Sequence, residues 1–263
     1  MRKYISMLLA LLLTSSVCAT AANTKVVASG KIVSKEIKGI AGFKEIQTNS
    51  SVSVIYHNAA DTRIVVSASD NVIPYIEVVK KGSRLEVGLK KGVNVRVKNS
   101  RADLKVNVYG PEVSAFTVKG SGDIRIATDL KADRLALGVS GSGDIECKAV
   151  SGDVVALGVT GSGDVKVSSV ATDELACGVS GSGDIVVAAG TVGSANYGVT
   201  GSGDIKASSV RATEANAVAS GSGDISCRAT KQLSTAAMGS GNIYYYGNPA
   251  KVIGKNKRVK ARN

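Results

Sequence analysis

A five-residue motif, Gly-Ser-Gly-Asp-Ile, recurs from residue 120 onward and constrains the fold more than any other feature of the chain. It begins at Gly120, Gly141, Gly181, Gly201 and Gly221, with the variants Gly-Ser-Gly-Asp-Val at Gly161 and Gly-Ser-Gly-Asn-Ile at Gly239. Successive copies lie 21, 20, 20, 20, 20 and 18 residues apart. Self-similarity at a short fixed period is typical of a solenoid, in which stacked repeats bury an apolar face that one repeat cannot bury alone.

Between the motifs, apolar side chains alternate with small or polar ones. Before Gly141, the side chains of Leu135, Leu137 and Val139 lie on one side of the chain, and the residues between them lie on the other. A period of two predicts β-strands, so each repeat is a strand, a glycine turn and a second strand. Equivalent strands of successive repeats then pair in parallel, one coil about every 4.8 Å. We therefore predict an all-β fold, a right-handed parallel β-helix with coils of about 20 residues.

These patterns divide the chain into five segments. Residues 41–119 lack the motif but alternate well, and they predict a less regular β region that caps the open end of the solenoid. Gly247-Asn248-Pro249 predicts the end of regular structure. The predicted organisation is a signal peptide at 1–21, an N-terminal linker at 22–40, the irregular β region at 41–119, the repeat β-helix at 120–246 and a basic C-terminal tail at 247–263.

The first residues have the pattern of a secretory signal peptide. Arg2 and Lys3 precede an apolar run, and the small residues Ala19-Thr20-Ala21 follow it. No later apolar run approaches the roughly 18 residues that a membrane-spanning helix needs. The sequence thus predicts an exported protein without a transmembrane segment, in the periplasm, on the outer surface or secreted. Cys18 leaves lipidation open.

The formal net charge of +12 is unevenly placed. One basic region lies within the irregular segment and another at the C-terminus, and they contain Lys90, Lys91, Arg96, Lys98, Arg101 and Lys105, and Lys251, Lys255, Lys257, Arg258, Lys260 and Arg262, respectively. Either could attract a polyanion, or the first is a solvated strand face and the second a disordered tail. Nucleic acid is not an expected partner, because the protein is predicted to be exported and no aromatic-rich basic motif accompanies the charge.

Three cysteines remain after the predicted cleavage, Cys147, Cys177 and Cys227, and an odd number cannot all pair within one chain. Cys147 and Cys227 occupy equivalent positions four coils apart, about 19 Å, which is far beyond disulfide reach. We predict buried, unpaired thiols. The absence of Trp and the presence of only two Phe favour a thin core of small side chains.

Each repeat also places a serine and an aspartate in its turn, and stacking brings them into two rows. The candidate ligand-binding residues are Ser142, Ser162, Ser182, Ser202 and Ser222, and Asp123, Asp144, Asp164, Asp184, Asp204 and Asp224. Such rows could hydrogen-bond a glycan or another cell-surface polymer, and a carboxylate row could bind Ca²⁺. The alternative is that each Asp caps its own turn while the glycines supply backbone freedom. Apart from this Ca²⁺ alternative, we predict no metal site and no cofactor.

The motif and the strands before it resemble the head GIN domain family. The resemblance rests on the Gly-Ser-Gly-Asp-Ile turn after Leu-x-Leu-x-Val strands, on Phe43-Lys44-Glu45-Ile46, and on the stretch from Leu104 to Pro111. It covers about residues 40 to 246. The family is described as autotransporter adhesins of Bacteroidetes with a β-helical fold, so the resemblance implies this fold and an adhesin-like role. Because no further strand-rich segment follows the repeats, we expect that this chain does not transport itself.

Catalysis is not expected. β-Helical polysaccharide-degrading enzymes use acidic pairs in distinct environments, whereas these carboxylates repeat uniformly. His57 is the lone histidine and is interpreted as a surface residue, and no nucleophile elbow, zinc motif or phosphate loop occurs. The sequence therefore predicts a non-catalytic exported surface-binding protein. The alternatives are a structural module of envelope assembly that binds other proteins, and a polysaccharide-degrading β-helix enzyme. The oligomeric state is left open.

Overall fold

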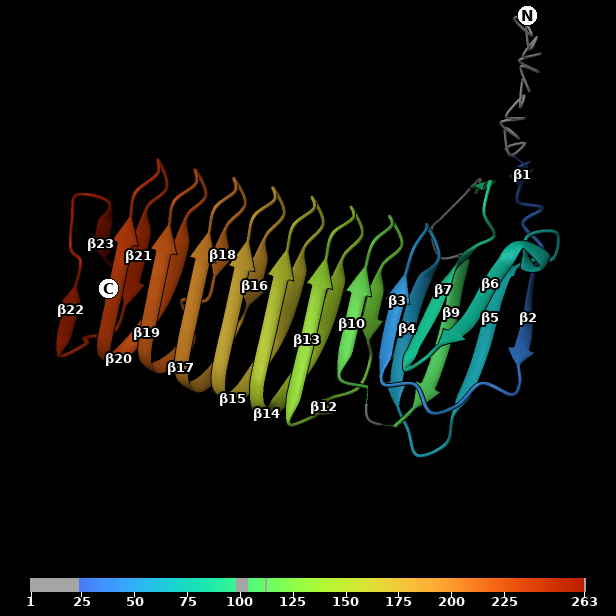
Figure 1. Ribbon diagram of the computed structural model, residues 1–263, viewed down its shortest axis with the longest axis horizontal. Coiled ribbons are helices and arrows are strands. Elements are labelled where there is room, and N and C mark those ends of the chain that lie inside the picture. Colours follow the sequence, from blue (N-terminus) through green and yellow to red (C-terminus); the bar gives the residue numbers. More distant parts are fainter. Residues whose placement is uncertain (1–23, 98–103, 112, 263) are drawn as a thin grey trace, which may run out of the picture.

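The computed structural model describes residues 24–97, 104–111 and 113–262, so the predicted signal peptide and Cys18 lie outside the described residues. The described chain is built from strands and one short 3₁₀ turn, η1 (Ile73–Tyr75). It forms a solenoid of about seven coils with roughly 20 residues in each, which confirms the predicted fold class. Figure 1 shows the coils stacked along the long axis of the molecule. No helix in these ranges is long and apolar enough to cross a membrane.

Equivalent strands of successive coils pair in parallel and in register. Leu135 is opposite Val155, which is opposite Leu175. A slip of one residue would turn these side chains toward solvent, so burial of the ladder fixes the register. The coils comprise β10 (Ala115–Val118), β11 (Ile124–Ile126), β12 (Leu130–Lys131), β13 (Arg134–Val139), β14 (Ile145–Val159), β15 (Val165–Val179), β16 (Ile185–Val187), β17 (Gly190–Val199), β18 (Ile205–Lys206), β19 (Val210–Ala219), β20 (Ile225–Ala237) and β21 (Ile243–Tyr246).

The core is a thin stack of aliphatic ladders with a few aromatic side chains, and Tyr197 is the one that lies in the middle coils. Tyr197 is 2 % exposed and lies between Cys177 and Ala217 on the neighbouring strands. The following coil is rich in buried alanines, which leave room for the ring. The Tyr197 hydroxyl has no hydrogen-bond partner among the described residues. By contrast, the buried Tyr56 hydroxyl donates to the Gly110 carbonyl at 2.6 Å.

These two tyrosines give a matched prediction. Tyr197→Phe removes a buried polar atom that lacks a partner, so we expect the free energy of unfolding to stay constant or to rise by about 1 kcal/mol. Tyr56→Phe removes a formed hydrogen bond and should lower the free energy of unfolding by about 1 kcal/mol. Urea unfolding of both variants measures the difference. A loss of stability in Tyr197→Phe as large as that in Tyr56→Phe would show that the Tyr197 hydroxyl has a partner.

The N-terminal region continues the two main sheets of the solenoid and then departs from its regularity. Two strands pair with the first coil in parallel, β3 with β10 and β4 with β11, whereas β5 pairs antiparallel with β2 and β9, and β6 pairs antiparallel with β7. The antiparallel strands lie at the end of the stack in Figure 1, beyond β3 and β4, which separate them from the first coil. The bounds are β1 (Thr24–Val27), β2 (Ile32–Ile37), β3 (Glu45–Thr48), β4 (Ser53–Asn58), β5 (Arg63–Ser69), β6 (Ile76–Lys81), β7 (Arg84–Leu89), β8 (Val93–Arg96) and β9 (Leu104–Gly110).

Two segments differ from their sequence-based description. The predicted linker at 22–40 contains β1 and β2, because β1 pairs with β8 and β2 pairs with β5, more than 25 residues away in the sequence. The predicted basic tail contains β22 (Lys251–Ile253) and β23 (Val259–Ala261), which pair with β20 and β21. Pro249 therefore does not end regular structure, and a disordered tail is wrong. Neither segment repeats the motif, so only the strand pairing in the structure reveals these strands.

Candidate functional site

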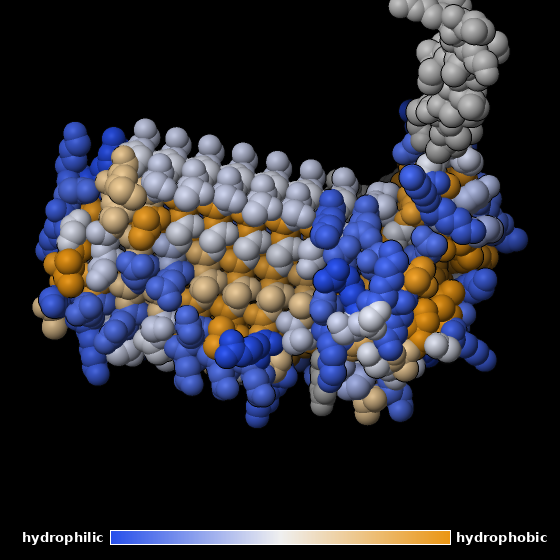
Figure 2. Space-filling model, in the orientation of Figure 1, coloured by the Kyte–Doolittle hydropathy of each residue, from blue (hydrophilic) through white to orange (hydrophobic). Residues whose placement is uncertain are grey.

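The glycine motifs form a row of stacked turns along one edge of the solenoid, here named the turn ridge (residues 140–144, 160–164, 180–184, 200–204 and 220–224). Figure 2 shows the turns as a regular pale row along the top of the molecule. Each turn bonds to its neighbour through backbone groups: the Ser162 N–H donates to the Gly141 carbonyl and the Ser182 N–H to the Gly161 carbonyl, both at 3.0 Å. The turns of successive coils are therefore held in a fixed register, as the strands are.

Close stacking explains the glycines of the turn ridge. A Cβ built on Gly161 or Gly163 would lie less than 3.0 Å from the backbone carbonyl of Gly141 or Gly143 in the preceding coil, closer than real Cβ contacts. None of these turn glycines has a positive φ within the described residues. The interpretation that they supply backbone freedom is therefore wrong, because the space beside their Cα atoms is already filled by the neighbouring turn.

The aspartates of the motif form a hydrogen-bonded ladder from coil to coil. Oδ1 of Asp144 accepts the backbone N–H of Asp164 at 2.8 Å, and Oδ1 of Asp164 accepts that of Asp184 at 2.9 Å. The same bond joins Asp123 to Asp144, Asp184 to Asp204, Asp204 to Asp224, and Asp224 to Asn242. Each carboxylate thus caps the next turn rather than its own. One oxygen of every such Asp is used for structure.

Two lysines lie beside the second oxygens of four aspartates in this row. Nζ of Lys166 lies 3.0 Å from Oδ2 of Asp164 and 3.9 Å from that of Asp144, and Lys206 lies 2.6 Å from Asp184 and 3.5 Å from Asp204. Burial alone raises the pKa of Asp164, but the Asp184 N–H and the Lys166 ammonium outweigh it and hold this pKa below its ordinary value. No group of His, Cys, Asp and Glu suited to a metal is assembled within the described ranges.

The serines of the motif lie at the outer tips of the turns. Ser142, Ser162, Ser182, Ser202 and Ser222 are all exposed. Their hydroxyls form no hydrogen bond with any described residue, whereas Ser140, Thr160 and Ser220 bond weakly to carbonyls of the preceding coil, at 3.4 to 3.5 Å. The tips therefore present a row of available hydroxyl groups, with one hydroxyl in each coil.

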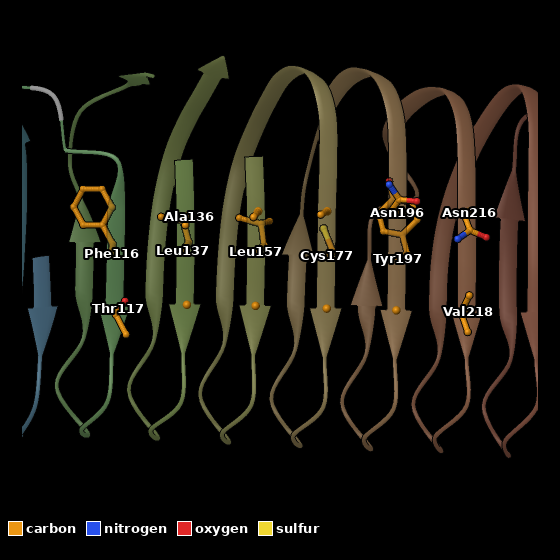
Figure 3. Close-up of a pocket in the computed structure, with 16 residues that line it drawn as sticks. Phe116, Thr117, Ala136, Leu137, Leu157, Cys177, Asn196, Tyr197, Asn216 and Val218 are labelled. Carbon is orange, nitrogen blue, oxygen red and sulfur yellow. The ribbon is translucent and has the colours of Figure 1, made fainter. Parts of the chain in front are cut away.

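A shallow, open trough of about 570 Å³ runs beside the turn ridge across the outer face of β10, β13, β14, β15, β17 and β19. Its floor is made of residues with short side chains or none, namely Ala136, Ala156, Ala176, Gly138, Gly158, Gly178 and Gly198, and two amides, Asn196 and Asn216, lie toward its C-terminal end. Figure 3 shows Ala136, Asn196 and Asn216 on separate strands, beside the core residues Leu137, Cys177 and Tyr197. Among the residues that the structure describes, no charged side chain lines the trough.

Figure 2 shows the trough as pale and tan bands below the turn ridge, with charged side chains gathered along the lower edge and at the ends. The trough residues do not belong to the predicted site. Sequence reasoning missed them because alanine and glycine carry no recognisable chemistry, although their recurrence on the outward phase of each strand was visible.

The remaining candidates for chemistry have structural roles. Cys147, Cys177 and Cys227 are buried and unpaired, as predicted, and burial raises the pKa of the Cys147 and Cys227 thiols to about 12. Such thiols are unreactive at neutral pH. His57 is half-buried and stacks on the Tyr109 ring with 4.5 Å between centroids, so it is less open to solvent than the sequence suggests.

The fold and the stacked turns define a β-solenoid repeat protein with an uncharged trough along one face. The family model described as "Putative auto-transporter adhesin, head GIN domain" matches residues 42–169 and 137–249. The chain belongs to this head GIN domain family. A comparison with curated proteins finds no match.

Several solved structures share this fold, among them three from Parabacteroides species. A "putative adhesin" from Parabacteroides merdae is 27% identical, with a TM-score of 0.81, over 91% of this chain and 100% of that one. A "putative adhesin" from Parabacteroides distasonis is 26% identical, with a TM-score of 0.82, over 90% and 100%. A "putative lipid binding protein" from the same species is 28% identical, with a TM-score of 0.80, over 91% and 100%.

Proposed function

We propose that the protein is an exported, adhesin-like binding protein that holds an uncharged glycan or similar cell-surface polymer along the turn ridge and the trough. The observation that carries this proposal is the straight row of exposed serine hydroxyls beside an uncharged, shallow trough that crosses several coils. A trough open along its length suits an extended chain better than a compact small molecule. The proposal contains no catalytic step.

The chemistry of the face matches a polyhydroxylated polymer. Serine hydroxyls both donate and accept hydrogen bonds, as sugar hydroxyls do. The alanine and glycine floor offers a flat apolar surface to the carbon faces of sugar rings. Because the turns are held by the backbone and Asp ladders, little conformational freedom is lost on binding. Weak contacts repeated coil by coil add up along one polymer chain.

In this proposal the Asp row supports the serines instead of contacting the polymer. Oδ1 of each ladder Asp already accepts a backbone N–H, and two lysines form ion pairs that involve four of the carboxylates. Binding should therefore not require Ca²⁺. The combined variant Asp144→Asn, Asp164→Asn and Asp184→Asn keeps the side-chain acceptors, so it should still bind.

Two further observations support an exported binding role. The predicted signal peptide leads to export, and family members and structural neighbours carry the name adhesin. The compartment proposed for the mature chain is the bacterial surface or the periplasm. A face that repeats along a rigid rod is well placed to meet a surface polymer there.

The test is a binding screen of the purified chain against mucin glycans, peptidoglycan fragments and chitin oligosaccharides, with and without Ca²⁺. We expect saturable binding to at least one of these polymers. The combined variant Ser162→Ala, Ser182→Ala and Ser202→Ala should lose about tenfold or more in affinity, because three hydrogen bonds are removed. Ala176→Arg, which places a long side chain in the trough, should also weaken binding.

The matched control is Ser168→Ala, Ser169→Ala and Ser209→Ala, three serines at another corner of the same coils. This control should bind like the unmodified chain. Equal loss in both triple variants, or no binding by the unmodified chain to any of these polymers, would contradict the proposal and favour a structural module that contacts other proteins. Cleavage of a bound polymer would favour the enzyme alternative.

A further inference from the structure

The last two coils form a basic end of the solenoid. From Ile225 to Asn263 the chain contains no Asp or Glu, and its basic residues are Arg228, Lys231, Lys251, Lys255, Lys257, Arg258, Lys260 and Arg262. The last acidic residue is Asp224. Most of these basic side chains are exposed. Some of them donate hydrogen bonds to carbonyl or amide oxygens or lie over tyrosine rings. This end therefore carries a concentrated positive charge.

The basic end is an ordered surface. Nη1 of Arg258 donates to the Ser240 carbonyl at 2.5 Å, and the Asn256 amide donates to the Ala237 carbonyl at 3.1 Å. These bonds fix the loop between β22 and β23 against the preceding turn, so Lys255 and Lys257 are held outward from an anchored backbone. Figure 1 shows this final coil at the end of the stack opposite the N-terminal strands.

Exposed apolar side chains lie among these cations. Met238 is 72 % exposed and Ile253 is 43 % exposed, and they are two of the four large hydrophobic residues so exposed within the described residues. Ile253 pairs with Ser234, and Met238 follows Ala237, whose carbonyl accepts the Asn256 amide. Both side chains thus belong to the same end of the solenoid. Figure 2 shows apolar and charged residues side by side there.

Two half-buried tyrosines add an amphipathic surface beside them. The Lys260 ammonium lies 5.5 Å and the Arg262 guanidinium 4.9 Å from the centroid of the Tyr244 ring. The Arg228 guanidinium lies 5.9 Å from the centroid of the Tyr246 ring. Tyrosine rings flanked by basic side chains suit the boundary between water and lipid, where the ring contacts apolar groups and the hydroxyl stays hydrated.

We propose that this basic end docks on an anionic lipid bilayer. Its lysines and arginines meet lipid phosphates, while Met238 and Ile253 enter the interface. A hydrated acidic polysaccharide would use the charges but gain little from the two apolar side chains, so a lipid surface accounts for more of the observations. This surface adjoins the C-terminal end of the turn ridge, because the Ser240 N–H donates to the Gly221 carbonyl. A rod that docks by this end would hold the rest of the turn ridge away from the membrane.

The test uses the purified chain without its predicted signal peptide and vesicles of phosphatidylcholine, with or without an equal amount of phosphatidylglycerol. We expect co-sedimentation with the anionic vesicles, decreasing as salt is raised, and little with the neutral ones. Lys251→Gln, Lys255→Gln and Lys257→Gln combined should weaken binding about a hundredfold, because each lysine near an anionic surface contributes several-fold. Met238→Ser with Ile253→Ser should weaken it about tenfold at constant charge.

The control for net charge is Lys25→Gln, Lys35→Gln and Lys38→Gln, which removes the same charge from exposed positions at the opposite end. It should bind anionic vesicles like the unmodified chain. Equal weakening by both lysine triples, or binding to soluble heparin but not to vesicles, would overturn the proposal. Each triple should leave polymer binding by the turn ridge unchanged, so failure here is distinguishable from failure of the proposed function.

Discussion

Replacing Gly183 with alanine is expected to lower the free energy of unfolding by about 3 kcal/mol, one of the largest effects of any single methyl group in this chain. The new Cβ would lie less than 3.0 Å from the carbonyl of Gly163 and from the backbone of Ser162. These are backbone atoms held by the turn ladder, so they cannot yield without separating two coils. Thermal unfolding followed by circular dichroism should show a decrease in Tm of about 10 °C.

Gly178→Ala is the matched control. Gly178 lies in the strand that leads into the same turn, and a Cβ at this position would meet no atom within 4 Å. Because alanine restricts the unfolded chain more than glycine does, this variant should be neutral or stabilising by about 0.5 kcal/mol. Equal stability of the Gly183→Ala and Gly178→Ala variants would show that the turns are not packed as tightly as the structure indicates.

Removing one carboxylate from the Asp ladder is the second change that we expect to lower the free energy of unfolding strongly. Asp164→Ala deletes the acceptor of the Asp184 N–H and the partner of Lys166, so we expect a loss of about 2 kcal/mol in the free energy of unfolding. Asp173→Ala is the control, since Asp173 lies exposed in the next strand and its side chain forms no hydrogen bond with a described residue. Urea unfolding should place Asp173→Ala within about 0.5 kcal/mol of the unmodified chain.

The ladder also predicts a pH dependence with a defined sign. The folded pKa of Asp164 lies below its unfolded value, so its charge contributes stability above the unfolded pKa of about 3.9, and this stability is lost as the pH falls through the folded pKa. The stability difference between the unmodified chain and Asp164→Asn should therefore be constant near neutral pH and shrink below about pH 4. A difference that grows on acidification would contradict the contacts of Asp164.

The repeat predicts the solenoid well because one physical rule applies in every coil. Alternation identifies Leu135, Leu137 and Val139 as inward residues, and the structure buries all three. The register follows from the period, since equivalent residues of successive coils must lie opposite one another. The unpaired, buried state of Cys147 and Cys227 follows from the same argument.

Contacts between coils are harder to predict than the coils themselves. The sequence shows that Asp144 and Asp164 are stacked, but not that a side-chain oxygen of one accepts the backbone N–H of the other. β2 pairs with β5, which lacks the motif and lies far away in the sequence, and β23 itself carries no motif, so no local pattern marks them. The trough could not be predicted for a different reason. Its floor is formed by residues without large side chains, such as Gly158 and Ala176, and these residues carry no recognisable motif.

Three residue types of the motif have different roles: glycine and aspartate hold the turns together, and we propose that serine contacts the ligand. A row of identical contacts has a consequence that a single compact site lacks, because affinity must depend on how many coils one polymer spans. Five serine tips at about 4.8 Å per coil extend over about 19 Å.

The most direct measurement is therefore the affinity for a bound polymer as a function of its length, by isothermal titration with oligomers of increasing size. We expect an affinity that rises with each added unit and levels off once the oligomer spans the row of serine tips. The same affinity for the shortest and the longest oligomers would contradict it, because binding would then take place at one local site and the repeated serines would not act together.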